Sequence, residues 1–338
     1  MYRLKKIMKT HEMSSFLFLA ALIFVVGCVN PSFWQPTSIL NCFNDSVVFT
    51  LLAVGSAFVI LTGEIDVSVG ATLGMSAAVG ATLLRDGSNW AVAILAALAI
   101  GAVIGFVNGF GVSVLQIPSL IFTLGVNGVV RGLIYVFTKG AWVENLPAGF
   151  TRMSNTLIAG QLTTFYAAAI LAVIVGHLIL TQTKKGKYFI AVGDNAAGAT
   201  LVGIPASQTK ITAYILSGVF AAAAGMIYTS RIGFITPTAG NSYEMKAIAA
   251  CVLGGVSLTG GQGSLIGASI GAVIMSSISR ILVFLGFSSD YDNTITGILL
   301  ITIVVLNTVT QNRAVLKNRH QILSARTVAG ADKKGGVQ

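Results

Sequence analysis

Charged side chains are scarce in this sequence: aspartate, glutamate, lysine and arginine make up 9% of its 338 residues, whereas hydrophobic residues make up 54%. Soluble domains carry about a quarter charged residues, so this chain has too few to build a water-facing surface. Its hydrophobic runs are apolar throughout, which excludes a β-barrel, because barrel strands alternate apolar and polar residues. The sequence therefore predicts an all-α fold, a polytopic transmembrane helical bundle.

Cysteine and histidine are also rare, with three of each. Cys28, Cys42 and Cys251 have neither the spacing of a disulfide framework nor that of a metal site. The sequence contains no G-x-x-x-x-G-K-[ST], no H-E-x-x-H and no G-x-S-x-G, which are motifs of nucleotide hydrolysis, metalloproteases and serine hydrolases. We therefore expect a protein that is not an enzyme, has no ATPase motif of its own and needs no cofactor or metal.

The net charge of +10 is concentrated in three segments. Fourteen of the 21 lysine and arginine residues fall in an N-terminal tail (1–12), an interior loop (183–208, with Lys210 just beyond it) and a C-terminal tail (313–338). Cytoplasmic loops carry an excess of lysine and arginine, so this distribution indicates topology and attraction to a lipid bilayer. Aromatic residues do not interleave with these charges, and we therefore expect no nucleic-acid partner.

Between the tails, the region 13–312 contains about ten apolar runs, several of them shorter than the roughly 20 residues that cross a bilayer as a helix. Six runs precede the interior loop and four follow it, so both tails and the loop are predicted on the cytoplasmic side. The runs are Ser14–Val29, Ser46–Thr62, Val67–Leu84, two between Gly87 and Thr138 divided at Gln116–Pro118, Phe165–Leu180, Ile211–Tyr228, Glu244–Leu258, Leu265–Leu285 and Thr294–Thr308.

Glycine is frequent (38 residues) and lies inside the apolar runs. Gly101, Gly105 and Gly109 recur every four residues, and Gly267 and Gly271 repeat that spacing. Small residues at this spacing lie on one helix face and let two helix backbones approach closely in lipid. We therefore expect a tightly packed bundle.

A few polar residues lie within the apolar region and are candidates for a solute pathway, because charges at membrane depth usually line a cavity or form pairs. Gly63–Gly70 holds two acids and a serine between two half-length runs, which predicts a broken helix; Ser68 is a candidate cap for the helix that follows. The alternative to a functional role is that a charged residue lies near the membrane–water interface or forms an ion pair that joins two helices. We favour this alternative for Arg131 and Arg280. The candidate pathway residues are Glu64, Asp66, Ser68, Asn108, Asn127 and Glu244.

The segment 183–204 cannot lie in lipid, because three lysines fall within four positions. Asp194 or Asn195 can cap a helix of about two turns, and Gly203 followed by Pro205 would end it. Such a helix would provide a binding surface for a soluble partner protein. The alternative is a basic loop that only fixes topology.

Together these segments resemble the ribose-type permeases of bacterial ABC importers. The resemblance runs in order over about residues 39–307 and is carried by Gly63–Gly70, by 183–204, by Glu244–Gly255 and by Gly260–Ser264. Glu64 stands where that family commonly has glycine. Within the family, Lys139–Pro147 and the block at Glu244 are most similar to permeases of autoinducer-2 import, with rhamnose permeases as the near alternative.

The resemblance implies a permease that moves a small polar, sugar-like solute through the bacterial inner membrane. Its implied partners are an ATP-binding subunit, a second permease that is identical or homologous, and a periplasmic solute-binding protein. It also implies a coupling helix that enters a groove on the ATPase, formed by Gly193, Asp194, Asn195, Ala196, Ala197 and Gly203. The rival hypothesis is an ion-coupled secondary transporter in which Glu64, Asp66 and Glu244 bind protons or sodium.

Overall fold

A computed structural model of the chain describes residues 11–158, 160–286, 288, 291–302 and 305. The tails predicted at 1–12 and 313–338 lie almost wholly outside these residues, as does the end of the predicted span Thr294–Thr308. The chain divides into two compact units, residues 1–296 and residues 297–338. In the second unit the described residues 297–302 are helical.

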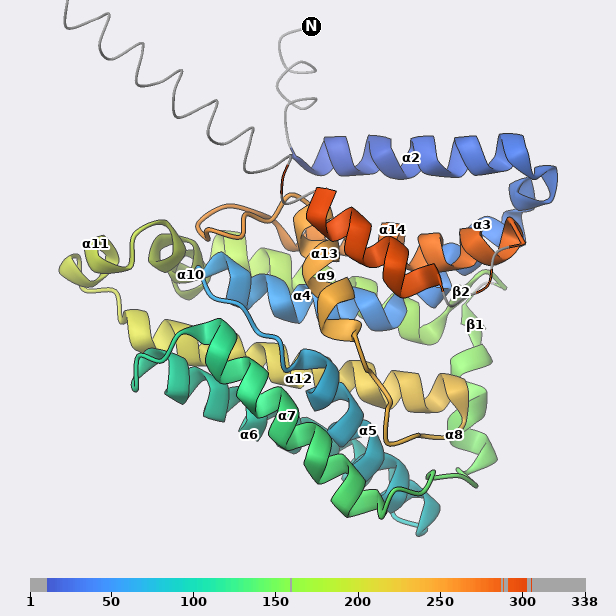
Figure 1. The fold of residues 1–338 in the computed structure, drawn as a ribbon, viewed down its shortest axis with the longest axis horizontal. Helices are drawn as coiled ribbons and strands as arrows, with labels where there is room; N and C mark the ends of the chain where they lie inside the picture. The colour runs from blue at the N-terminus through green and yellow to red at the C-terminus, as the bar shows by residue number, and fades with distance from the viewer. Residues whose placement is uncertain (1–10, 159, 287, 289–290, 303–304, 306–338) are drawn as a thin grey trace, which may run out of the picture. The chain divides into compact units, whose positions relative to one another are not determined.

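The first unit is built almost entirely from helices (Figure 1). Its N-terminal half contains α2 (His11–Val29), η1 (Pro31–Trp34), α3 (Pro36–Asp45), α4 (Val47–Leu61), α5 (Val69–Arg85), α6 (Trp90–Ser113) and α7 (Ser119–Thr138). Its C-terminal half contains α8 (Ala148–Arg152), η2 (Met153–Asn155), the strands β1 (Leu157–Ile158) and β2 (Leu162–Thr163), α9 (Thr164–Gln182), α10 (Lys184–Asp194), α11 (Ala196–Leu201), α12 (Ala206–Ile232), α13 (Tyr243–Leu253) and α14 (Leu265–Phe284). The two strands form an antiparallel pair with Leu157 opposite Thr163.

Five of the described helices are long and apolar enough to cross a membrane, namely α6, α7, α9, α12 and the part of α14 that ends at Leu282. A sixth is added if α3 and α4, which are bent by 42° at their junction, count as one span. The predicted class, a polytopic helical membrane bundle, is confirmed. The predicted span Glu244–Leu258 is wrong in length, because α13 has 11 residues and is about 16 Å long, against a hydrocarbon core of about 30 Å.

Helix α4 lies at the centre of the unit. Every residue from Val47 to Leu61 except Phe49 is buried, and α12, α13 and α14 pack around it. A helix that is apolar on all sides can be covered by protein or by lipid. Helix α6 is also apolar on all sides and is mostly uncovered by protein, so the central position of α4 follows from its packing rather than from its composition alone.

Helices α6 and α12 are in close backbone contact, as the glycine spacing predicted. A methyl group on Gly101 or Gly105 would overlap the carbonyl oxygen of Gly218 or Tyr214 on α12. The predicted glycine pair on α14 acts in the same way, because a methyl on Gly271 would overlap the carbonyl oxygen of Ala250 on α13. Glycine therefore sets the helix spacing at both interfaces.

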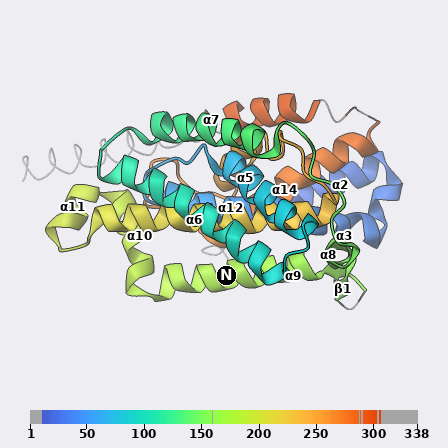
Figure 2. The same ribbon diagram turned by 90° about the horizontal axis from the view of Figure 1, so that it is seen from below.

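The short helices lie at opposite ends of α12. In Figures 1 and 2, α10 and α11 lie at its N-terminal end, whereas α8 lies at its C-terminal end. A hydrogen bond holds α8 against the end of α12: the Ser230 hydroxyl of α12 donates to the carbonyl oxygen of Phe150 in α8 (2.6 Å). The two ends of the bundle therefore carry different sets of loops.

Candidate functional site

The predicted break in the helix is present. Helix α4 ends at Leu61, α5 begins at Val69, and the residues between them, 62–68, form an irregular segment that we call the helix break. Gly63, its second residue, has φ of +81°, a left-handed conformation that other residues adopt only at a cost. The break therefore exposes a helix end and free backbone groups inside the bundle, where neighbouring side chains must satisfy them.

Helix α12 holds the break through three successive contacts. The Lys210 ammonium pairs with the Glu64 carboxylate (2.5 Å). The Tyr214 hydroxyl donates to the carbonyl oxygen of Ile65 (3.2 Å), and the Ser217 hydroxyl donates to Asp66 Oδ2 (2.9 Å). Positions 210, 214 and 217 share one helix face, so this single face of α12 contacts residues 64, 65 and 66 in order.

Asp66 is 3% exposed and is the centre of a buried polar network. Its Oδ1 accepts hydrogen bonds from the Ser68 backbone N–H (2.9 Å) and the Ser68 hydroxyl (2.7 Å). The Asn108 amide of α6 donates to the same Ser68 hydroxyl (2.7 Å). The prediction that Ser68 caps α5 is wrong, because its hydroxyl is turned towards Asp66 and makes no capping bond.

Helix α7 completes the support of the break. The Ser119 hydroxyl accepts from the Ile65 backbone N–H (3.3 Å), and the Thr123 hydroxyl accepts from the N–H of Val67 (3.1 Å). Asn127 follows Thr123 by one helical turn and is half-buried. Its Oδ1, like that of Asn108, is buried and has no hydrogen-bond partner among the described residues. Both amides therefore keep an acceptor available for a hydroxyl or a water.

Glu244 lies apart from this network, over the first turn of α5. It is 8% exposed, and its Oε2, which has no partner among the described residues, lies where a methyl on Gly70 would be. Arg131 of α7 also lies beside Gly70 and donates to the carbonyl oxygens of Ala239 and Gly240 (2.6 Å each). Of the six candidate pathway residues, the structure therefore joins Asp66, Ser68 and Asn108 directly.

The interior basic segment forms two helices rather than one. Residues 184–194, expected to be a loop, form α10, whose N-cap Thr183 accepts from the Gly186 N–H (2.9 Å). The second helix, α11, is the predicted short one. Asn195 caps it by accepting from the Gly198 N–H (2.8 Å), whereas Asp194 is the last residue of α10. Gly203 follows with φ of +83°.

The end of α11 presents apolar side chains to the outside. Leu201 is 89% exposed and Val202 is 77% exposed, in a segment that begins with three lysines and cannot lie in lipid. Isolated apolar residues on a surface need no explanation, but two adjacent and almost fully exposed ones on a capped helix are suited to contact with another protein. We call residues 193–203 the coupling segment.

A cavity of about 470 Å³ lies between the coupling segment and the break. Glu64 and Lys210 line it together with α11, the start of α12 and the connection between α6 and α7. About half of its lining residues carry hydroxyl, amide or charged groups, those of Ser113, Gln116, Ser119, Thr200 and Ser207 among them, and the rest are apolar. The cavity is therefore of mixed polarity and borders the coupling segment at Ala196, Ala197 and Thr200.

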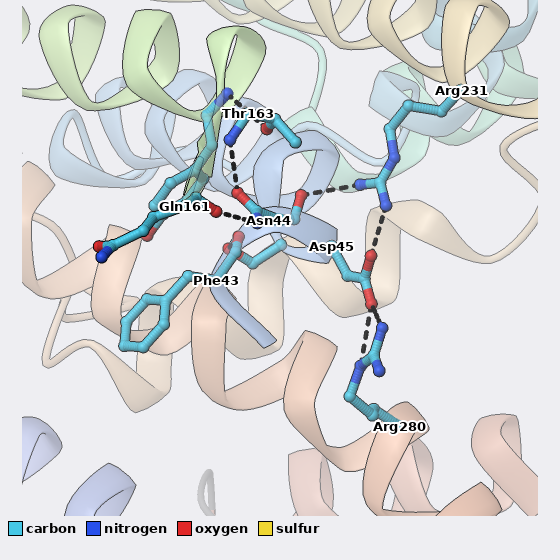
Figure 3. A network of polar contacts seen from close by, with 9 residues as sticks. Phe43, Asn44, Asp45, Gln161, Thr163, Arg231 and Arg280 are labelled. Atoms are coloured by element: carbon cyan, nitrogen blue, oxygen red, sulfur yellow. Dashed lines mark hydrogen bonds and ion pairs between the residues drawn. The ribbon is translucent and has the colours of Figure 1, made fainter. Parts of the chain in front are cut away.

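A second charged cluster lies at the other end of α12 (Figure 3). Asp45, the last residue of α3, accepts from Arg231 of α12 (2.5 Å) and from Arg280 of α14 (3.0 Å to Nε). Arg231 also donates to the carbonyl oxygen of Asn44 (2.9 Å). We call this trio the Asp45 cluster. For Arg280 the structure shows the expected ion pair between helices.

Several important residues were not identified from the sequence. The spacing of Lys210, Tyr214 and Ser217 places them on one helix face, which the sequence does show. Their hydrogen-bond partners lie about 150 positions earlier in the chain, so the contacts themselves could not be predicted. Lys246 lies in the apolar run Glu244–Leu258, but its ion-pair partner Asp292, whose side chain is 20% exposed, lies 46 positions later, so the sequence did not predict the pairing. Among the described residues no group of three or more His, Cys, Asp or Glu residues could hold a metal ion.

A bundle of apolar helices with a broken central helix and polar groups at depth defines a multi-pass membrane protein of the transport class. Residues 38–304 match the family described as the permease component of branched-chain amino acid transport systems, and the chain belongs to that family. It is thus a transport component rather than a catalytic enzyme.

Curated relatives are similar over most of the chain. The autoinducer 2 import system permease protein LsrC of Enterobacter sp. (strain 638) is 39% identical over 90% of this chain and 88% of the relative. The protein of the same name from Yersinia pseudotuberculosis is 36% identical over 98% of this chain and 99% of the relative, and that of Escherichia coli is 37% identical over 90% and 89%. No solved structure matches the chain.

Proposed function

We propose that this chain is the membrane-spanning permease subunit of a bacterial ABC importer for autoinducer-2 or a related pentose or hexose. An ATP-binding subunit would drive it, a second identical or homologous permease would complete the pathway, and a periplasmic binding protein would deliver the solute. The membrane is the inner membrane, with both termini in the cytoplasm. The relatives' names support the solute, and the family supports the class of transport.

The observation that carries this proposal is the coupling segment. It is a capped helix outside the apolar region, with Leu201 and Val202 almost fully exposed. An ATPase groove that covered these two side chains would remove them from water and hold the helix. The ATPase contact would be made by Gly193, Asp194, Asn195, Ala196, Ala197 and Gly203, with Leu201 and Val202 as its apolar side chains.

The unpartnered buried acceptors support a solute rich in hydroxyl groups. Asn108, Asn127 and Glu244 each keep a buried oxygen without a partner among the described residues. A sugar hydroxyl would donate a hydrogen bond to such an acceptor. A buried acceptor that is left without a hydrogen bond costs about 1–3 kcal/mol. The proposed pathway residues are Glu64, Asp66, Ser68, Asn108, Asn127 and Glu244, several of which act through the helix break rather than by touching solute.

The test is uptake by proteoliposomes that contain the chain, its ATPase and its binding protein. We expect ATP-dependent accumulation of labelled autoinducer-2, with ribose and rhamnose as competing solutes that rank the alternatives. An ionophore should leave the rate unchanged, and an ATPase lacking its catalytic glutamate should abolish uptake. Uptake that collapses with the ionophore and persists without the ATPase would replace this proposal by the ion-coupled transporter.

A further inference from the structure

The coupling segment and the helix break are in direct backbone contact. The carbonyl oxygen of Leu61, freed where α4 ends, accepts a hydrogen bond from the Gly261 N–H (3.0 Å). Gly193, at the end of α10, lies against this bond, since a methyl there would overlap the Leu61 oxygen. A methyl on Gly260 would lie 2.7 Å from the Gly63 nitrogen. Three distant segments therefore meet here without a layer of side chains between them.

A second contact joins the two segments from the other side. Pro205 leads from the coupling segment directly into α12, and the first turns of α12 carry Lys210 and Tyr214, which hold Glu64 and Ile65. The Glu64–Lys210 pair is about four-fifths shielded from water, with side-chain exposures of 17% and 20%. Shielding of this degree strengthens an ion pair relative to one on an open surface.

Resting on the proposed function, we infer that the coupling segment and the helix break move as one body. Movement of the ATPase would then reach the break, and with it the Asp66 network, through the glycine junction (Gly63, Gly193, Gly260 and Gly261) and the Glu64–Lys210 pair. Backbones packed without intervening side chains have no soft layer to absorb a displacement. Glu64 and Lys210 are thus positioning residues for transport.

The ion pair is tested by a double-mutant cycle in the reconstituted complex. The variants are Glu64→Gln, Lys210→Gln, the two together, and the charge-swapped Glu64→Lys/Lys210→Glu. The measurement is the number of solute molecules taken up per ATP hydrolysed. We expect each single variant to lower this ratio by about fivefold, the double to lose no more than either single, and the swapped pair to recover part of the loss.

The glycine junction is tested by Gly260→Ala, with Gly87→Ala as its matched control. Both glycines have φ of +85°, but Gly87 has open space around it whereas Gly260 lies against Gly63 and Gly193. The backbone strain of the two substitutions is therefore similar, and only Gly260→Ala pushes the segments apart. For Gly260→Ala we expect ATP hydrolysis to continue while the number of solute molecules taken up per ATP falls by about tenfold or more. For Gly87→Ala we expect the wild-type ratio of uptake to hydrolysis.

The inference is overturned if the single ion-pair variants keep the wild-type ratio, or if the double variant multiplies their losses. Equal ratios for Gly260→Ala and Gly87→Ala would overturn it as well. If Gly260→Ala fails to assemble with the ATPase, the ion-pair cycle decides alone, because the two glutamine variants remove charge without adding side-chain volume. A wild-type complex without ATP-driven uptake would instead contradict the proposed function.

Discussion

At the scale of single residues, Asp66 shows how a carboxylate is buried in this protein with no ion-pair partner among the residues that the structure describes. Its two oxygens accept three hydrogen bonds, two from Ser68 and one from Ser217. Hydrogen bonds to a charged acceptor are about twice as strong as neutral ones, which offsets part of the loss of water. The bond from Ser217 ties α12 to the helix break, and the two from Ser68 fix the fold of the break itself, so Asp66 positions the break whichever groups touch the solute.

We predict that Asp66→Asn reduces uptake more than it reduces assembly. The amide keeps one acceptor for the Ser68 N–H, and the Ser217 hydroxyl can turn to accept from the new NH₂ group. The folded state should therefore lose only about 1 kcal/mol, whereas the charge that orders the break is lost. The measurements are transport rate in proteoliposomes and yield of the complex with the ATPase.

Asp66→Ala is the contrasting variant, because it leaves three buried donors without their acceptor and should reduce the yield of complex itself. If Asp66→Asn transports at the wild-type rate, the role of Asp66 is only the structural one of holding the start of α5.

The sequence predicted where the helix break lies but not which hydrogen bonds hold it. The two acids and flanking glycines predicted the break, because such residues are poor helix formers within an apolar run. The role of Ser68 could not be read from the sequence, since its hydroxyl has both Asp66 and Asn108 within reach and the second lies 40 positions away. Likewise, Asp194 and Asn195 are equally good caps, and the choice depends on α10, which the sequence did not reveal.

At the scale of elements, the coupling segment depends on where α11 stops. The Ile204 N–H donates to the Ala199 carbonyl oxygen (3.0 Å) around Gly203. This closure requires a left-handed residue, and the following Pro205 cannot continue the helix. The predicted features of this element are confirmed, because capping and stop signals are local. The contact of Gly193, at the end of α10, with Leu61 of α4 was not predictable, since it involves segments far apart in the chain.

We predict that Gly203→Val uncouples transport from ATP hydrolysis while membrane insertion stays intact. A β-branched residue is strongly disfavoured at φ of +83°, so α11 should end differently and displace the coupling segment. The measurement is uptake together with ATP hydrolysis by the reconstituted complex.

Gly203→Asn is the matched control, because asparagine tolerates the left-handed conformation better than other non-glycine residues. It should retain most of the uptake. Normal ATP-driven uptake by Gly203→Val would count against the coupling role of this helix end.

The Asp45 cluster joins three other elements, and we predict that Asp45→Asn lowers the stability of the folded state by about 1–2 kcal/mol. This value lies between those of exposed and buried ion pairs, because the three side chains are 26–32% exposed. The measurement is the thermal unfolding midpoint of the purified protein in detergent, at low and at high salt.

Asp86→Asn is the control, since the Arg85–Asp86 pair is an exposed contact between neighbours, with Asp86 at 57%. That variant should stay within about 0.5 kcal/mol of the wild type. Equal midpoints for the two variants would show that the Asp45 cluster adds nothing to stability.

At the scale of the whole molecule, composition alone determined the class, because a chain with 9% charged residues has no other stable environment than a bilayer. The number of crossings was harder to predict. Hydrophobicity does not separate a span such as α12, with 27 residues, from a half-length buried helix such as α13, with 11. Both are apolar, and only their packing and length in the fold distinguish them.

The topology of the molecule gives the last prediction, which uses the native cysteines. Cys28 is exposed, whereas Cys42 and Cys251 are buried, so Cys28→Ser provides a background with little labelling. Thr200→Cys on α11 and Asn155→Cys beside α8 then place single exposed thiols at opposite ends of α12. Because α12 is about 40 Å long, the two thiols should lie on opposite sides of the membrane.

We expect a membrane-impermeant maleimide to label Thr200→Cys only in inside-out vesicles and Asn155→Cys only in right-side-out vesicles. The lysine-rich segment at α10 requires this orientation, since positive charge is retained on the cytoplasmic side. Binding of the ATPase should then protect Thr200→Cys and leave Asn155→Cys reactive. The reverse labelling pattern would place the coupling segment outside the cell, where no ATP is available to drive it, and the importer mechanism would have to be abandoned.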